Sequence, residues 1–195
     1  SSAASDVYKR QLRVPEITII FWVIKGFSTA LGEATSDFMV HAIAPAVAVL
    51  LGFAAFVVAL ILAFRKARYS PCTYWFAVVM VGIFGTMAAD VLHVALGVPY
   101  TATTILYALV LVGVFTTWWL TEKTLSIHSI DSPRREAFYW AAVVATFAMG
   151  TALGDFTAYT LHLGYFSSAA LFVGIMAIPS IGNRWLRWNG VLSFW

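Results

Sequence analysis

Charged residues are scarce in this sequence: Asp, Glu, Lys and Arg make up 11% of its 195 residues, whereas 61% are hydrophobic. A soluble domain of this size would have too little polar surface to cover so apolar an interior. The low charge therefore excludes an ordinary soluble domain. The mean hydropathy of +0.84 instead favours an integral membrane protein whose main partner is the lipid bilayer.

Cysteine and the common catalytic motifs are also missing or nearly so. Cys72 is the only cysteine, so no internal disulfide can form. The sequence has no Walker motif, HExxH, GxSxG or CxxC, and no two histidines have the spacing of a haem-binding helix bundle. We therefore expect no enzyme and no cofactor apart from a bound divalent metal ion. An intramembrane enzyme stays an alternative because facing aspartates can exchange protons.

Six apolar stretches each approach the length of about 20 residues that a transmembrane helix needs. They are residues 15–37, 42–64, 73–95, 101–121, 137–161 and 165–182. A seventh begins at Asn189 and stops at Trp195. The predicted fold class is an all-α integral membrane protein of tandem helical hairpins, with six full spans and the start of a seventh.

The basic residues fall in alternate connections between these stretches. They are Arg13, Arg65, Lys66, Arg68, Lys123, Arg134, Arg135, Arg184 and Arg187, whereas the opposite connections around His41, 96–99 and 163–164 have no Lys or Arg. By the positive-inside rule, the N-terminus is cytoplasmic. The net charge of +3 forms no single patch, so we expect no nucleic-acid partner.

An internal repeat links the predicted helices in pairs. Trp22, Trp75 and Trp140 each follow another aromatic residue, and the residues after them agree at fixed offsets. Ten residues after each tryptophan comes a glycine: Gly32, Gly85 and Gly150. Eleven residues after it comes Glu or Thr: Glu33, Thr86 and Thr151. Fifteen residues after it comes an aspartate: Asp37, Asp90 and Asp155. This threefold recurrence predicts three two-helix repeats.

The repeat boundaries follow from the same offsets. We place the repeats at residues 12–68, 69–130 and 131–188, and a fourth begins at 189–195, where Phe194 and Trp195 match the aromatic pair. A further Gly and Asp are expected beyond Trp195. Residues 1–11 resemble a translated adapter sequence and are interpreted as a non-native leader.

The repeat residues share one helix face. An α-helix turns about 100° per residue, so offsets of eleven and fifteen residues lie within about 60° of the tryptophan. Because each repeat has two spans, all repeats enter the membrane in the same direction. Their Asp-bearing faces can therefore converge at one depth.

Glu33, Asp37, Asp90 and Asp155 are the only acidic residues deep within the predicted spans. An ionised carboxylate costs at least about 2.5 kcal/mol in a bilayer on insertion scales, so such residues usually face a cavity, a partner or an ion. We predict that the four bind an ion or protons. The alternative, that they lie at wetted helix ends, does not explain the repeated offset.

Each repeat aspartate is followed by a histidine on the same helix face: His41, His93 and His162 follow by four, three and seven residues. Carboxylate and imidazole ligands together suit divalent transition ions, so we predict these histidines as auxiliary metal ligands. The same groups could relay protons, or the histidines could lie at the interface without a role.

Lys25 is the one basic residue well inside a predicted span. We expect its ammonium group to snorkel toward the cytoplasm, or else to neutralise a repeat carboxylate when no cation is bound. Small and hydroxyl residues are expected at helix contacts: Gly32, Gly85, Gly150 and Gly154, with Thr29, Thr86 and Thr151. The repeat tryptophans are expected to be packing or interfacial anchors.

Three runs carry a family resemblance: VPEITIIFWVIKGFSTALGEATSDF from Val14, YWFAVVMVGIFGTMAADVLH from Tyr74 and REAFYWAAVVATFAMGTALGDF from Arg135. They resemble bacterial uncharacterised membrane-anchored proteins built of four tandem repeats of unknown function, each with two transmembrane segments and a characteristic Trp. The resemblance covers about residues 13–195, three repeats and the start of the fourth. It implies the repeat architecture, Trp22, Trp75 and Trp140 as the repeat tryptophans, and a multi-pass protein of the bacterial inner (plasma) membrane. It implies no activity.

The leading hypothesis is a secondary transporter, or channel-like carrier, for a small cation, either a divalent metal or a proton-coupled ion. It follows from repeated intramembrane carboxylates without a nucleotide-binding motif. The alternative is a non-transporting membrane scaffold or sensor, in which the carboxylates hold helices together through Lys25, threonines and backbone donors. The sequence predicts neither the transported species nor the oligomeric state.

Overall fold

The computed structural model describes residues 13–15, 18–66 and 68–195, apart from the side chains of three residues in the last long helix. The predicted leader at residues 1–11 lies outside this part. The helices are α2 (Ile19–Ala42), α3 (Pro45–Phe64), α4 (Pro71–Asp90), α5 (Tyr100–Glu122), α6 (Pro133–Asp155), α7 (Gly164–Leu186) and the short α8 (Gly190–Phe194). The described part contains no strand, which confirms the all-α fold class.

Several helix starts follow from local sequence. Prolines open α3, α4 and α6, because their fixed backbone angle suits the first helical turn and they have no N–H to leave unpaired there. Thr18 caps α2 by accepting a hydrogen bond from the backbone N–H of Phe21 at 3.2 Å. These signals lie at the boundaries that separate the apolar stretches.

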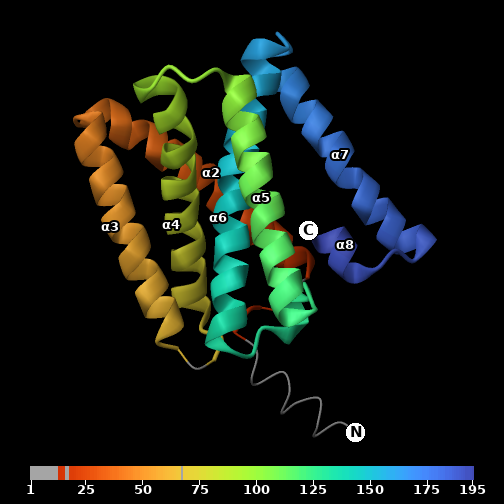
Figure 1. The fold of residues 1–195 in the computed structure, drawn as a ribbon. Helices are drawn as coiled ribbons and strands as arrows, with labels where there is room; N and C mark the ends of the chain where they lie inside the picture. The colour runs from red at the N-terminus through yellow and green to blue at the C-terminus, as the bar shows by residue number, and fades with distance from the viewer. Residues whose placement is uncertain (1–12, 16–17, 67) are drawn as a thin grey trace, which may run out of the picture.

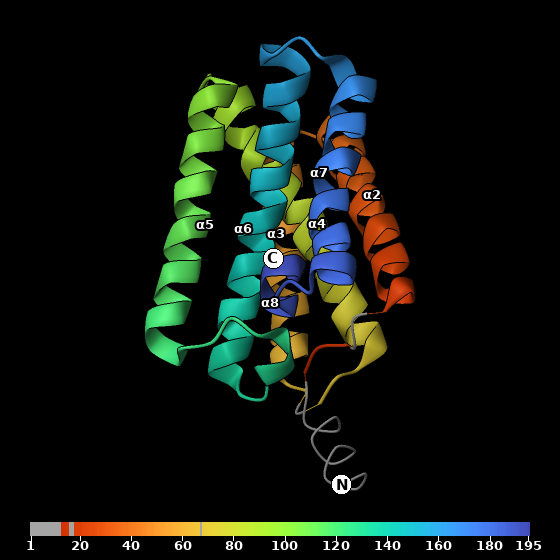
Figure 2. The same cartoon turned by 90° about the vertical axis from the view of Figure 1, so that its right-hand side faces the viewer.

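The helices pack across repeat boundaries (Figures 1 and 2). The central helix α4 packs against α2 on one side and α6 on the other. The second helix of each repeat packs on the first helix of the next one, α3 on α4 and α5 on α6. Helix α7 packs mainly on α8 and the end of α6, and it leans away from the bundle in Figure 1.

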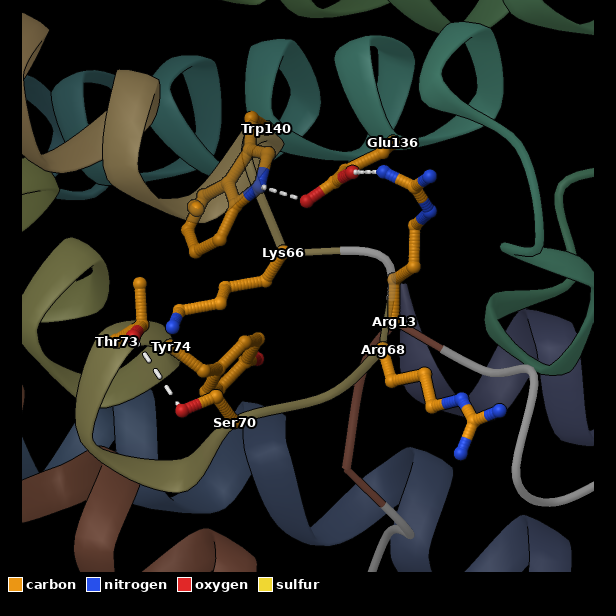
Figure 3. Close-up of a pocket in the computed structure, with 9 residues that line it drawn as sticks. Arg13, Lys66, Arg68, Ser70, Thr73, Tyr74, Glu136 and Trp140 are labelled. Atoms are coloured by element: carbon orange, nitrogen blue, oxygen red, sulfur yellow. Dashed lines mark hydrogen bonds and ion pairs between the residues drawn. The ribbon is translucent and has the colours of Figure 1, made fainter.

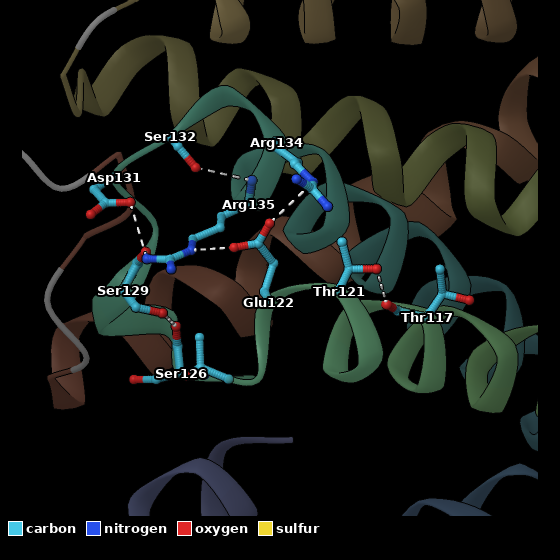
Figure 4. A network of polar contacts seen from close by, with 10 residues as sticks. Thr117, Thr121, Glu122, Ser126, Ser129, Asp131, Ser132, Arg134 and Arg135 are labelled. Atoms are coloured by element: carbon cyan, nitrogen blue, oxygen red, sulfur yellow. Dashed lines mark hydrogen bonds and ion pairs between the residues drawn. The ribbon is translucent and has the colours of Figure 1, made fainter.

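Two ends of the bundle differ in charge. The N-terminal segment, the α3–α4 connection and the α5–α6 loop meet at one end, here called the basic end (Figure 1). Ion pairs to Glu122 hold the α5–α6 loop there, with Arg135 Nε at 2.8 Å and Arg134 Nε at 3.1 Å (Figure 4). Arg135 also pairs with Asp131 at 3.3 Å.

A buried ion pair ties the start of the chain to α6 (Figure 3). Arg13 Nη1 donates to Glu136 Oε2 at 2.5 Å, and their side chains are only 12% and 4% exposed. Trp140 Nε1 donates to the other oxygen of Glu136 at 3.4 Å. The backbone N–H of Arg13 donates to Ile130 O at 3.1 Å, so the N-terminal segment is fixed beside the α5–α6 loop.

Four helical segments in the described part are long and apolar enough to cross a membrane, so the predicted count of six spans is not confirmed. They are Pro45–Phe64, Pro71–Ala95, Tyr100–Glu122 and Pro133–Thr160. Helix α2 carries Lys25, Glu33 and Asp37, which lower its hydropathy. Among the described residues, α7 contributes the apolar segment Gly164–Pro179.

Candidate functional site

The first helices of the repeats lie in register. Tyr74 and Tyr139, which each precede a repeat tryptophan, share a hydrogen bond of 2.5 Å between their hydroxyl groups. Twelve residues further along the same two helices, the hydroxyl oxygens of Thr86 and Thr151 are 3.5 Å apart. Because equivalent positions meet at both levels, α4 and α6 present their aspartates at the same depth.

The structure brings together the four acidic residues that the sequence singled out. Asp90 lies close enough to Asp155, Asp37 and Glu33 for their charges to interact, and Asp155 interacts in turn with Glu33 and Asp37. Asp90 and Asp155 are half-buried, whereas Glu33 and Asp37 are exposed. We call these residues the carboxylate cluster, and the end of the bundle where they lie the carboxylate end.

The carboxylate cluster has no donor partner in the described part of the chain. None of its four side chains forms an ion pair or a hydrogen bond with another described residue. Elsewhere in the bundle the buried Glu136 is fully paired, with Arg13 and Trp140. The cluster therefore consists of like charges that the surrounding protein does not neutralise.

Two π-helical turns begin directly after repeat aspartates. The turn η1 (Val91–Ala95) follows Asp90, and η3 (Phe156–Thr160) follows Asp155. Such wide turns break the regular hydrogen bonding of an α-helix and are frequent at functional sites. Sequence reasoning missed them, because no residue pattern distinguishes them from continued α-helix.

The chain after each π-turn also agrees between the two repeats. A residue with positive φ comes seven positions after each aspartate, Gly97 with φ of 66° and His162 with φ of 56°. Helix α2 differs, because it continues without a π-turn past Asp37 to Ala42. The first repeat thus departs from the other two at the carboxylate end.

The predicted metal ligands His41, His93 and His162 are not gathered around one point. His41 Nδ1 lies 2.7 Å from the backbone oxygen of Asp37, so this ring bonds to its own helix. His162 is exposed in the turn after η3. Among the residues that the structure describes, no group of three or more His, Cys, Asp and Glu side chains is placed to hold a metal ion.

His93 lies close enough to both Asp90 and Asp155 for its charge to interact with theirs. Its Nδ1–H donates to Val98 O at 2.8 Å, and its ring stacks on Tyr100 with centroids 3.6 Å apart. The bond to Val98 assigns the proton to Nδ1, which leaves Nε2 as the acceptor. His93 can therefore exchange a proton beside the cluster.

Lys25 points into the bundle, toward α6. Its Nζ lies 3.9 Å from the ring centroid of Phe147. The attraction between a cation and an aromatic face holds it there. No ion pair joins it to a described carboxylate.

The repeat glycines differ in their surroundings. A Cβ at Gly32 would lie 2.9 Å from the Gly82 Cα, and one at Gly85 would lie 2.9 Å from the Phe147 Cβ, so both mark close helix contacts. Gly150 and Gly154 face open space, with nothing within 4 Å of an added Cβ.

The repeat tryptophans and threonines also differ in their surroundings. Trp140 is buried at 3% exposure, whereas Trp22 is 42% exposed. Trp75 packs against the core around Tyr74. Thr29 donates to the backbone oxygen of Lys25 at 2.9 Å, within its own helix. Thr86 and Thr151 instead face each other between two helices.

Comparison with known families found one match. The sequence model of a repeat of unknown function (DUF347) matches residues 73–124 and 138–185, together more than half of the chain. The matches begin early in α4 and α6; the first ends two residues after α5 and the second ends late in α7, so each spans one helical pair. Neither curated proteins nor solved structures gave a match.

Proposed function

Because the chain belongs to the family of repeats of unknown function (DUF347), which brings no activity with it, we propose a function from its geometry. The protein is a multi-pass membrane carrier that moves a small cation or protons by way of the carboxylate cluster. One observation carries this proposal: four carboxylates from three helices converge, and no described residue donates to any of them.

The free energy of such a cluster depends on what binds to it. Like charges held close together at the edge of an apolar bundle repel each other more strongly than they would in bulk water. A proton or a cation bound between them removes this repulsion, so the cluster favours an occupied state over an empty one. Half-buried Asp90 and Asp155 feel this effect most, while exposed Glu33 and Asp37 give access from the surrounding water.

The charge distribution supports one orientation in the membrane. The basic end lies in the cytoplasm by the positive-inside rule, and the carboxylate end faces outward. In this proposal α2 and α7 cross the bilayer alongside the four more apolar segments, since they have the length to do so. In this proposal the membrane is the bacterial plasma membrane, which the resemblance to bacterial membrane-anchored proteins supports.

The ligand geometry favours a proton or a monovalent cation as the main cargo. Protons can pass among Asp90, Asp155 and His93 one at a time, without several groups binding at once. A divalent metal needs several ligands together, and the described conformation does not gather three. A divalent ion therefore stands as the second class of cargo.

The scaffold alternative makes a different use of the carboxylates. It requires that they hold helices together through Lys25, threonines or backbone donors. In the described part of the chain these groups have other partners: Lys25 lies over Phe147, and Thr104 donates to Ala152 O at 3.0 Å. A tyrosine adds a further neutral bond, from Tyr107 to Ala88 O at 2.6 Å. The helices are thus joined by neutral hydrogen bonds near the cluster, and the carboxylates do not take part.

Cation-dependent thermal stability of the purified protein tests the proposal. A ligand that binds only the folded state raises the melting temperature by mass action. We expect a selective rise with one of H⁺, Na⁺, K⁺, Mg²⁺, Mn²⁺ or Zn²⁺, lost in Asp90→Asn and Asp155→Asn but kept in Asp131→Asn, a loop carboxylate of the basic end. Flux of the selected ion into proteoliposomes then separates a carrier from a binding protein.

Either of two results would exclude the carrier. One is a melting temperature that none of the six cations shifts in the parent protein. The other is a shift without ion flux in sealed proteoliposomes. If Asp90→Asn lowers stability without any cation, the carboxylates hold the fold together and the scaffold reading replaces the carrier.

A further inference from the structure

The aromatic residues at the basic end form a closed circuit. In each contact the residue before one repeat tryptophan meets the tryptophan of the next repeat. The ring centroids are 5.5 Å apart for Phe21–Trp75, 5.5 Å for Tyr74–Trp140 and 6.1 Å for Tyr139–Trp195. The fourth pair, Phe194–Trp22 at 5.8 Å, returns to the first repeat and closes the circuit. We call these eight residues the aromatic collar.

The collar places α8 in the series of first helices. Its pair Phe194 and Trp195 makes the same two contacts as the pairs of α4 and α6, one to the preceding repeat and one to the following repeat. Going round the collar, α2 is opposite α6 and α4 is opposite α8. The first helices therefore surround a common axis, with a pseudo-fourfold arrangement at the basic end.

Four of the eight collar residues are almost fully buried. Phe21, Tyr74, Tyr139 and Trp140 are each at most 4% exposed. The hydroxyl groups of Tyr74 and Tyr139 bond to each other rather than to water. Beyond the collar, Lys25 reaches across the axis from α2 to Phe147 on the opposite helix.

We propose that the aromatic collar is the cytoplasmic gate of the carrier, and that it is closed in the described conformation. This inference rests on the proposed function, because it takes the axis as the route of the cation. Transport then requires the collar contacts to separate. Lys25 lies between the gate and the cluster, where its charge repels a cation until the gate opens.

Accessibility of a thiol placed inside the gate tests the closure. In a Cys72→Ser background, Ser28→Cys puts a thiol on α2, between the collar and the carboxylate cluster, at a site that is 6% exposed. We expect a membrane-impermeant thiol reagent applied from the basic end to label it very slowly. Trp140→Ala should speed labelling about tenfold or more, since a minor open state is commonly populated at roughly 0.1–10%. Phe84→Ala, which removes an aromatic ring stacked on Phe56 where α4 packs on α3, should leave the labelling rate unchanged.

A cross-link tests the gate without enlarging a cavity. Trp22→Cys and Phe194→Cys, joined by a short bifunctional thiol reagent in the Cys72→Ser background, hold the collar closed. We expect the cation-dependent thermal shift to persist and the flux to be lost, with flux restored when the cross-link is cleaved. Undiminished flux through the cross-linked protein, or fast labelling of Ser28→Cys with an intact collar, would overturn the gate. If no cation raises the melting temperature of the parent protein, the proposed function itself is overturned.

Discussion

Tyr74 and Tyr139 occupy the same position in successive repeats, and their hydroxyl oxygens form a hydrogen bond of 2.5 Å between α4 and α6. Both side chains are almost fully buried, at 4% and 3% exposure. One hydroxyl must donate and the other must accept, so each is satisfied by its repeat-related partner. The repeat thus supplies both halves of one buried polar contact.

Replacing these tyrosines singly and together should reveal their dependence on each other. Tyr74→Phe or Tyr139→Phe leaves one buried hydroxyl without its partner and should cost about 1–3 kcal/mol of unfolding free energy. The double variant leaves no hydroxyl unpaired, so it should cost no more than either single change. Denaturant unfolding in detergent, followed by tryptophan fluorescence, measures all three. Additive losses in the double variant would show that the hydrogen bond does not couple the two residues.

Gly32 and Gly150 share one repeat position but should respond oppositely to alanine. At Gly32 the added Cβ would meet the backbone of Gly82 at 2.9 Å, which cannot move without shifting α4. We expect Gly32→Ala to destabilise the protein by about 1–3 kcal/mol. Gly150→Ala has open space and should be neutral, or stabilising by up to about 1 kcal/mol, because alanine favours the helix. Thermal unfolding of the two variants side by side checks this, and equal effects would contradict the close α2–α4 contact.

The repeat pattern predicted more of this structure than local sequence did. Apolar runs placed the helices to within a few residues, and the offset from Trp to Asp predicted that the acidic side chains of separate helices can lie at one depth. Both predictions use the spacing of residues along the sequence. An α-helix has a fixed rise and turn per residue, so this spacing determines where the residues lie on the helix. The membrane span count was harder, since Lys25, Glu33 and Asp37 lower the apolar character of α2 without ending the helix.

Other features depend on packing between distant residues and have no local signal. The direction of Lys25 is decided by Phe147, which lies on another helix more than a hundred residues away. The π-turns after Asp90 and Asp155 look like ordinary helix in sequence. The aromatic collar is closed by the contact between Phe194 and Trp22, which lie at opposite ends of the sequence. In each case the competing local preference is weak, so the tertiary contact decides the outcome.

Breaking the pair of Arg13 and Glu136 should cost more than breaking a surface pair. Glu136→Ala leaves a buried guanidinium without its partner and should lower stability by about 3 kcal/mol. Asp131→Ala removes a partly exposed partner of Arg135 at the same end of the bundle and should cost about 1 kcal/mol or less. Unfolding midpoints of the two variants give the comparison. Similar small losses would mean that the N-terminal segment is not anchored through Glu136.

His162 and Gly97 can be exchanged to test whether the histidine serves the backbone turn or a metal. A residue other than glycine in the left-handed region costs roughly 1–2 kcal/mol, and His162 has φ of 56° there. His162→Gly should therefore raise stability by up to about 1 kcal/mol, while Gly97→His, which has open space for a side chain, should lower it by a similar amount. Melting temperatures measured with and without Mn²⁺ or Zn²⁺ distinguish the two roles. If His162 serves only the turn, each substitution changes the melting temperature by the same amount with and without the metal ion. If the gain in His162→Gly turns into a loss only when metal is present, His162 is a metal ligand after all, and the turn must rearrange to bring it toward the carboxylate cluster.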